Sequence, residues 1–280
     1  MKSALALLVL AASTTAATAA DSPPLRPDQM EFRSLFRELV ETNTAHSNGS
    51  CTLAAERMAA RLKDAGFKDE DLILFSTPEA PKDGGLVATL AGTSTALKPM
   101  VLLAHIDVVE AKREDWVRDP FTFIEENGNY YGRGVVDDKA LAAIWTDAMV
   151  RFKKEGYRPK RTIRLALTCG EETSGVFNGA QWLAQNRKDL MDAAFVLNEG
   201  GGGLTDGKGR IVSQNLQVGE KNYQDFVLET TNPGGHSSIP VRDNALYQMA
   251  AALLKVRDLE FPLMMTDTTR TFLARAGEMR

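Results

Sequence analysis

The segment that most constrains the fold is an apolar run at residues 100–104, Met-Val-Leu-Leu-Ala. A near-continuous run of this kind is typical of a strand buried on both faces. Further strands are predicted at 72–75, 86–91 and 162–168, and a second buried strand at 194–198. The two buried strands need cover on both sides of the sheet that contains them.

Segments with apolar residues at helical spacing supply that cover. They lie at residues 29–41 and 53–65, before the predicted strands, and at 138–154 and 179–186, between them. This alternation predicts an α/β domain with helices on both faces of a sheet. After Gly200 the sequence changes to a glycine-rich loop, then to longer half-polar strands over 210–231 and an amphipathic helix over 243–257. We therefore expect a second domain from about residue 220.

The N-terminus has the pattern of a secretory signal peptide. Lys2 precedes an apolar stretch over residues 4–12, and small residues follow up to Ala19 and Ala20, where cleavage is expected. The stretch is too short for a membrane span, which needs about 20 apolar residues. Residues 1–20 are therefore predicted to be removed, leaving a periplasmic or secreted protein with no membrane association.

The composition of the chain excludes some classes of partner and of metal site. The 280 residues include 33 Lys and Arg and 37 Asp and Glu, a net charge of -4. This balance argues against nucleic acid, which needs a basic face. Two cysteines are too few for a disulfide framework or a thiolate zinc site. The sequence leaves open whether Cys51 and Cys169 pair.

Acidic and histidine residues concentrate just after predicted strands, where sites form in open α/β sheets. The segments that carry them are LAHID (103–107), GRGVVDDK (132–139), CGEE (169–172) and LNEG (197–200). Several carboxylates side by side repel one another, and a divalent metal relieves that repulsion. One imidazole with several carboxylates suits zinc, with Co²⁺ or Mn²⁺ as substitutes.

Taken one at a time, these residues have simpler structural explanations. His105 could be a hydrogen-bonded core histidine at the end of a strand. Glu171 and Glu172 could begin a helix, where acids are favoured. Asp137 and Asp138 could cap the next helix. Only the combination of the four segments favours a metal site over these readings.

Five ordered motifs make the sequence similar to the M20 family of metallopeptidases, which includes glutamate carboxypeptidase, aminoacylase and carnosinase-like enzymes. They are HIDVV with the following Trp116 and DPF, then YYGRGVVDDK, GEE, NEGGG and GGHSSIP, and the similarity spans about residues 30–260. The resemblance implies a zinc-peptidase-type catalytic domain, residues 21–219, with a central mixed sheet flanked by helices. It also implies an α+β lid domain of the dimerisation type, incomplete here, over residues 220–280.

The resemblance assigns four metal ligands. His105 would bind one Zn²⁺, and Glu199 would complete the protein ligands of that ion. Asp137 would bridge the two ions, and Glu172 would bind the second.

The same resemblance assigns three further roles. Glu171 would be the general base that takes a proton from the attacking water. Asp107 would fix the imidazole of His105. His236 would belong to the lid and stabilise the oxyanion, often in the active site of a partner subunit.

The implied activity is metal-dependent hydrolysis of amide bonds in peptides or N-acyl amino acids, by a protein that forms homodimers through the lid. Carboxypeptidase, dipeptidase and aminoacylase specificity stay open. The sequence also departs from the family, because the second metal needs another histidine and none follows His236. We therefore expect an N-terminal fragment of a longer enzyme that is inactive alone. The alternatives are an inactive metal-binding scaffold protein and a mononuclear zinc hydrolase using His105, Asp137 and Glu199.

Overall fold

The computed structural model describes residues 24–220 and 223–278. Contacts divide the chain into two compact units, Met1–Glu199 and Gly200–Arg280, and each is described by itself. The predicted signal peptide lies outside the described residues. The domain boundary near residue 220 stays a prediction.

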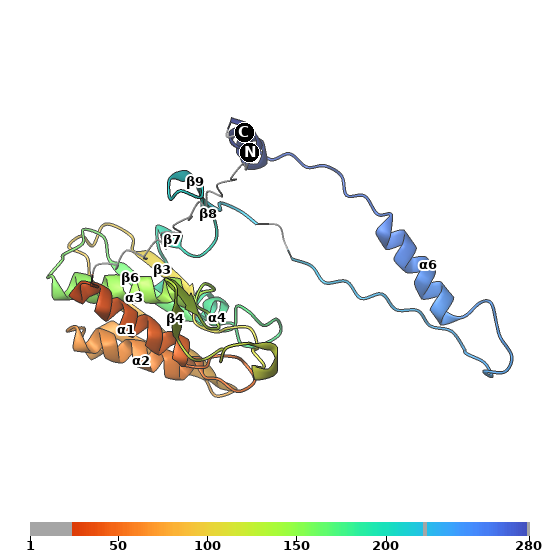
Figure 1. The fold of residues 1–280 in the computed structure, drawn as a ribbon, viewed down its shortest axis with the longest axis horizontal. Helices are drawn as coiled ribbons and strands as arrows, with labels where there is room; N and C mark the ends of the chain where they lie inside the picture. The colour runs from red at the N-terminus through yellow and green to blue at the C-terminus, as the bar shows by residue number, and fades with distance from the viewer. Residues whose placement is uncertain (1–23, 221–222, 279–280) are drawn as a thin grey trace, which may run out of the picture. The chain divides into compact units, whose positions relative to one another are not determined.

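The first unit contains a five-stranded sheet with the strand order β1-β2-β6-β3-β7 (Figure 1). β1 (Leu72–Thr77) pairs antiparallel with β2 (Ala80–Leu90), which pairs antiparallel with β6 (Ile163–Thr168). β3 (Met100–His105) lies between β6 and β7 (Phe195–Leu197) and runs parallel to both. The predicted α/β architecture with a mixed sheet is confirmed.

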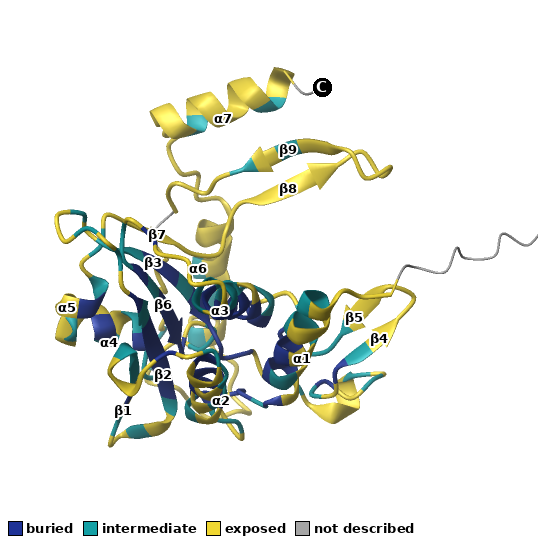
Figure 2. Cartoon of the chain, turned by 90° about the vertical axis from the view of Figure 1, so that its left-hand side faces the viewer, coloured by how far each residue is buried: buried dark blue, intermediate teal, exposed yellow. Residues whose placement is uncertain are grey.

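Three helices cover one face of this sheet, α1 (Pro27–Glu41), α2 (Cys51–Asp64) and α3 (Lys139–Lys154) (Figure 2). They bury the apolar positions that recur at helical spacing, and Leu39 and Met58 have no exposed surface. α2 begins where the Ser50 hydroxyl accepts a hydrogen bond from the main-chain N–H of Leu53 at 3.2 Å. This face holds the larger hydrophobic core.

Two short helices, α4 (Gly179–Asn186) and α5 (Lys188–Met191), cover the opposite face. Leu183 and Leu190 pack there with apolar side chains of the sheet. The prediction of helices on both faces is therefore confirmed. A separate hairpin, β4 (Ile124–Glu126) with β5 (Asn129–Tyr131), and two short 3₁₀ turns, Asp69–Asp71 and Arg113–Asp115, complete the unit.

The prediction that residues 194–198 form a second buried strand is only half right. β7 forms, but its residues Phe195, Val196 and Leu197 are 46%, 45% and 41% exposed. The reason is its position, because β7 is the last strand of the described sheet and pairs on one side only. An apolar run identifies a strand but not its place in the sheet.

A disulfide joins Cys51 to Cys169 and settles the question that the sequence left open. It links the first residue of α2 to the residue that follows β6, 118 positions further along the chain. Cys169 directly precedes the Gly-Glu-Glu segment. The crosslink therefore lies at the base of the loop that carries Glu171 and Glu172.

The second unit contains a hairpin of β8 (Gly202–Thr205) and β9 (Ile211–Asn215), together with α6 (Ala245–Arg257) and α7 (Asp267–Glu278). The prediction of strands throughout 210–231 is wrong beyond residue 215 in the described part. Phe226 and Val227, 85% and 90% exposed, have no sheet neighbour there to bury them.

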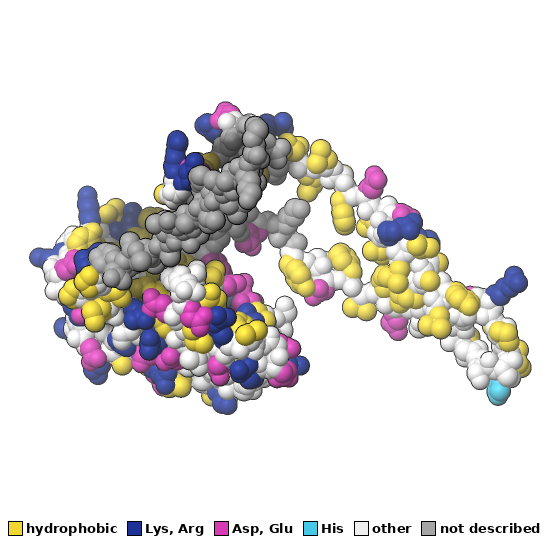
Figure 3. Space-filling view, in the orientation of Figure 1, with side chains coloured by type: hydrophobic (Ala, Val, Ile, Leu, Met, Phe, Trp, Pro, Cys, Tyr) yellow, Lys and Arg dark blue, Asp and Glu magenta, His cyan; other side chains and the backbone are white. Residues whose placement is uncertain are grey.

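The helix prediction at 243–257 is confirmed by α6, whereas α7 was not foreseen. Much of the apolar surface of α6 is exposed, as the space-filling view shows (Figure 3). In the described residues, no helix is both long enough and apolar enough to cross a membrane.

Candidate metal centre

The strand order brings three of the four acidic segments to one edge of the sheet. β6, β3 and β7 are parallel neighbours, so their carboxyl ends lie at the same edge. His105 is the last residue of β3, and Glu199 follows β7 by two residues. Glu171 and Glu172 follow β6. The fold therefore brings together side chains from three segments that lie far apart in the sequence.

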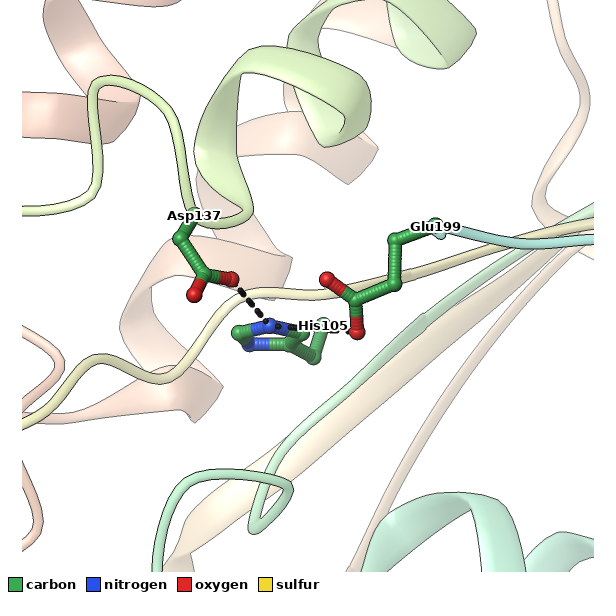
Figure 4. Close-up of side chains that lie close together, drawn as sticks. All are labelled: His105, Asp137 and Glu199. Atoms are coloured by element: carbon green, nitrogen blue, oxygen red, sulfur yellow. Dashed lines mark hydrogen bonds and ion pairs between the residues drawn. The ribbon is translucent and has the colours of Figure 1, made fainter. Parts of the chain in front are cut away.

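His105 is the centre of the cluster and is 4% exposed. Its Nδ1 lies 3.1 Å from the main-chain oxygen of Asp107, and because a carbonyl oxygen only accepts, Nδ1 must donate. Its Nε2 faces two carboxylates, 3.0 Å from Oδ1 of Asp137 and 3.6 Å from Oε1 of Glu199 (Figure 4). The ring is thus oriented by one nitrogen and presents the other to the acids.

The ligand atoms of His105, Asp137 and Glu199 all lie within 4.8 Å of one another. A second group, His105 with Glu171 and Glu172, meets the same limit. The structure therefore brings together all four residues predicted as metal ligands and the predicted base. Their roles stay predictions.

Asp107 connects the histidine to the glutamate loop. Its side chain is buried, and its Oδ2 accepts a hydrogen bond of 3.0 Å from the main-chain N–H of Glu172. Burial opposes its charge, but hydrogen bonds and the charge of His105 lower its pKa below the ordinary value. Asp107 is therefore a fixed anion behind the imidazole, as a metal-binding histidine requires.

The Glu171-Glu172 loop needs glycine at position 170. Gly170 has φ +85°, and a Cβ there would lie 1.8 Å from the main-chain oxygen of Phe177. The glycine lets the chain turn sharply after the disulfide and direct both glutamates to the sheet edge.

Asp138 makes a contact that the sequence does not predict. It precedes α3 but makes no side-chain cap hydrogen bond. Its Oδ2 instead accepts a hydrogen bond of 3.3 Å from the main-chain N–H of His105. The Asp137–Asp138 peptide bond is cis. The simple capping explanation of this acid pair is therefore wrong for Asp138.

Lys139 belongs to the same GRGVVDDK segment, and no role for it is predicted from the sequence. Its side chain is fully buried, and Nζ donates a hydrogen bond of 2.8 Å to the main-chain oxygen of Thr42. Burial lowers its pKa to about 7. Lys139 joins the start of α3 to the segment after α1, beneath the acid cluster.

The charges of the cluster favour a cation. Burial opposes protonation of His105, but the hydrogen bond to Asp107 and the charges of Asp107, Glu199 and Asp138 outweigh it and raise its pKa to about 10. Burial raises the pKa of Asp138 to about 7, and burial and neighbouring carboxylates raise that of Glu199. The site thus stabilises positive charge at Nε2 of His105. One imidazole with several carboxylates is a donor set that fits zinc.

The other two histidines are His46 and His236. His46 is in the first unit, with Nδ1 3.8 Å from Asp83. His236 belongs to the second unit and is exposed, with Nδ1 2.7 Å from the Ser238 hydroxyl. Its role at the oxyanion stays a prediction.

Comparison with known proteins finds a matching protein family. The sequence profile of peptidase family M20/M25/M40 matches residues 101–277. Human N-fatty-acyl-amino acid synthase/hydrolase PM20D1 is 32% identical over 202 residues, 70% of this chain and 39% of the human protein. A Schizosaccharomyces pombe protein named uncharacterized carboxypeptidase C24C9.08 is 36% identical over 206 residues, 70% of this chain and 34% of that protein.

The fold is also found among solved structures. The M20 family metallo-carboxypeptidase Sso-CP2 from Sulfolobus solfataricus aligns with a TM-score of 0.51 and 20% identity. The alignment covers 64% of this chain and 38% of that one. The matched part of this chain thus spans less than half the length of each of these three proteins.

Proposed function

The chain belongs to peptidase family M20/M25/M40, and on that basis we propose that it is part of an exported, metal-dependent hydrolase of amide bonds. The observation that carries the proposal is the group of His105, Asp137 and Glu199, whose ligand atoms lie within 4.8 Å of one another. Export to the periplasm or the medium follows from the pattern of residues 1–20.

The residues that would hold metal are those at the sheet edge. His105 Nε2, Asp137 and Glu199 would hold one ion. The family resemblance assigns the second ion to Glu172, with Asp137 as a shared ligand. When bound, Zn²⁺ acidifies a coordinated water and polarises the scissile carbonyl. The second ion has carboxylates alone in the described cluster, which makes a weak site for zinc. We therefore propose one tightly held ion per chain and no turnover by this chain alone.

Glu171 is proposed to move the proton. Its side chain is 55% exposed, and its Oε2 lies 3.9 Å from Nε2 of His105, at the outer side of the cluster. A carboxylate there can take the proton of the attacking water and give it to the leaving amine nitrogen. Glu172, whose main-chain N–H donates to Asp107, is proposed as a metal ligand.

Peptides or N-acyl amino acids are the proposed substrates, because relatives are named as a carboxypeptidase and as an N-fatty-acyl-amino acid synthase/hydrolase. An amide carbonyl also needs a donor for its developing negative charge, and His236 is proposed for that role. The second unit is proposed to serve as a lid through which copies of the protein pair.

The test is hydrolysis of dipeptides and N-acyl amino acids by the zinc-loaded chain, with and without added free imidazole. Free imidazole can supply the missing nitrogen ligand, so turnover is expected to appear with it. Glu171→Gln should keep its metal and lose at least about 10²-fold of that rate. Glu172→Gln should also lower the metal content. Hydrolysis that survives Glu171→Gln, or metal-loaded protein that cleaves nothing at any imidazole concentration, contradicts the proposal.

A further inference from the structure

A small cavity lies beside Asp107, next to the acidic side chains around His105. Its volume is about 10 Å³, and Thr44, Asp83, Asp107, Cys169 and Gly170 are part of its wall. About this volume is what one water molecule needs. The cavity lies within the first unit and borders the disulfide.

Two residues of this wall each have a buried side-chain oxygen with no hydrogen-bond partner among the described residues. These oxygens are Oγ1 of Thr44 and Oδ1 of Asp107, in residues that are 1% and 4% exposed. Oδ1 lies 3.5 Å from Nδ1 of His105, but that nitrogen has its shorter contact, 3.1 Å, with the main-chain oxygen of Asp107. Buried polar atoms without partners are unfavourable, and ordered water usually satisfies them.

We propose that this cavity binds one ordered water molecule that links Thr44 to Asp107. A carboxylate oxygen only accepts, so the water donates one hydrogen to Oδ1 of Asp107. The Thr44 hydroxyl then donates to the water oxygen. The second hydrogen of the water faces the rest of the wall, where Asp83 offers a carboxylate. Both unpartnered atoms are satisfied by a single molecule.

The water gives Asp107 a third point of attachment. The main-chain oxygen of Asp107 accepts from His105, and Oδ2 accepts from Glu172. With Oδ1 held by the water, the carboxylate cannot rotate Oδ2 away from Glu172, and Oδ1 stays 3.5 Å from Nδ1 of His105. Thr44 itself is held in place, because the neighbouring Ala45 forms a parallel bridge with Val108.

Thr44 is therefore a positioning residue that acts through the water and Asp107 on two residues of the cluster. Partners behind metal ligands typically change metal affinity by about 10–100-fold when they are removed. The effect on metal rests on the proposed metal site, whereas the water itself does not. The two claims can thus be tested separately.

The water is tested by a high-resolution crystal structure of the chain. The expected result is one density peak within hydrogen-bonding distance of Thr44 Oγ1 and Asp107 Oδ1. An empty cavity, or a peak with the short contacts of a bound cation, would overturn the proposal. This observation decides the water even if the chain proves to bind no metal, a result that would contradict only the proposed function.

The role of Thr44 is tested by Thr44→Val, which keeps the volume and removes the hydroxyl. The zinc Kd, measured against a competing chelator, should rise about tenfold or more, and Thr44→Ser should restore it. The Nδ1–H signal of His105 in ¹⁵N-histidine spectra should broaden in Thr44→Val only. Thr146→Val is the matched control, because Thr146 is buried but its hydroxyl binds Ala142 O inside α3. A Kd within twofold of wild type in Thr44→Val overturns the role.

Discussion

Oδ2 of Asp107 accepts a hydrogen bond from the main-chain N–H of Glu172 at 3.0 Å, across 65 positions of sequence. The same residue holds Nδ1 of His105 through its main-chain oxygen. One aspartate therefore fixes the imidazole at the end of β3 and the glutamate loop after β6. The two halves of the acidic cluster are therefore linked through a single residue.

Asp107→Asn should weaken zinc binding by about 10–100-fold, because the amide carries no charge behind the imidazole. The fold should persist, since the side chain keeps its size. Chelator competition measures the Kd, and Asp64→Asn, an exposed change on α2, is the control. Unchanged affinity in Asp107→Asn would show that the charge of Asp107 does not contribute to zinc binding.

Gly170→Ala should destabilise the first unit by more than about 3 kcal/mol, because it adds a steric clash to left-handed backbone strain. Gly175 also has a positive φ, +80°, but a Cβ there meets nothing within 4 Å. Gly175→Ala should therefore lose only about 1–2 kcal/mol. Urea unfolding of both variants gives the comparison. Equal losses would mean that the clash with Phe177 O is relieved by a small shift.

Loss of the Cys51–Cys169 disulfide should lower stability by about 2–5 kcal/mol, since it closes a long loop in the unfolded chain. Unfolding of the wild-type chain with and without a reductant measures this. The reduced chain should also bind zinc more weakly, because Cys169 lies at the base of the glutamate loop. If reduction lowers stability but leaves the zinc Kd unchanged, the disulfide stabilises the fold without supporting zinc binding.

Zinc uptake at pH 7 should release about one proton or more per ion. The pKa of His105 is raised to about 10, so the metal-free imidazole is charged at pH 7 and must lose its proton to bind. Affinity should therefore rise with pH up to about 10. Calorimetric titrations in buffers of different ionisation enthalpy count the protons. Zinc binding without proton release would mean that His105 is not a ligand.

The same pKa gives the sign of a stability effect in the metal-free chain. Because the pKa of His105 is raised on folding, its contribution is fully present below about pH 6.5 and is lost as pH rises towards about 10. A metal-free His105→Gln variant should therefore differ most from wild type below pH 6.5. A difference that grows above pH 8 has the wrong sign for this account.

Sequence alone could predict the sheet and the cluster because both depend on local patterns. Apolar runs identified each strand of the sheet, and parallel strands necessarily bring the residues after them to one edge. His105, Glu172 and Glu199 could thus be named from their positions after strands, and Asp137 from the family motif. The disulfide could not be predicted, because nothing local shows that two distant cysteines meet.

The remaining differences arise from long-range context. β7 is half exposed because it lies at the edge of the described sheet. Residues 216–220 and 223–231 form no strand because they have no partner strand in the described part of the chain, and the β-propensity of a segment does not show whether a partner exists. The sequence around Thr44 is that of an ordinary loop. Its proposed role follows only from the cavity that it shares with Asp107. From its sequence position Asp138 resembles a helix cap, but in the fold its side chain accepts a hydrogen bond from the main chain of His105.

The central claim is that His105 with its carboxylates forms the metal site of this chain. It is tested most directly by equilibrium dialysis of wild type, His105→Gln and His46→Gln against Zn²⁺, followed by elemental analysis. The account predicts one tightly held ion in wild type and His46→Gln, and less than about a tenth of that in His105→Gln. Equal zinc in His105→Gln and wild type, or zinc lost from His46→Gln alone, would contradict it.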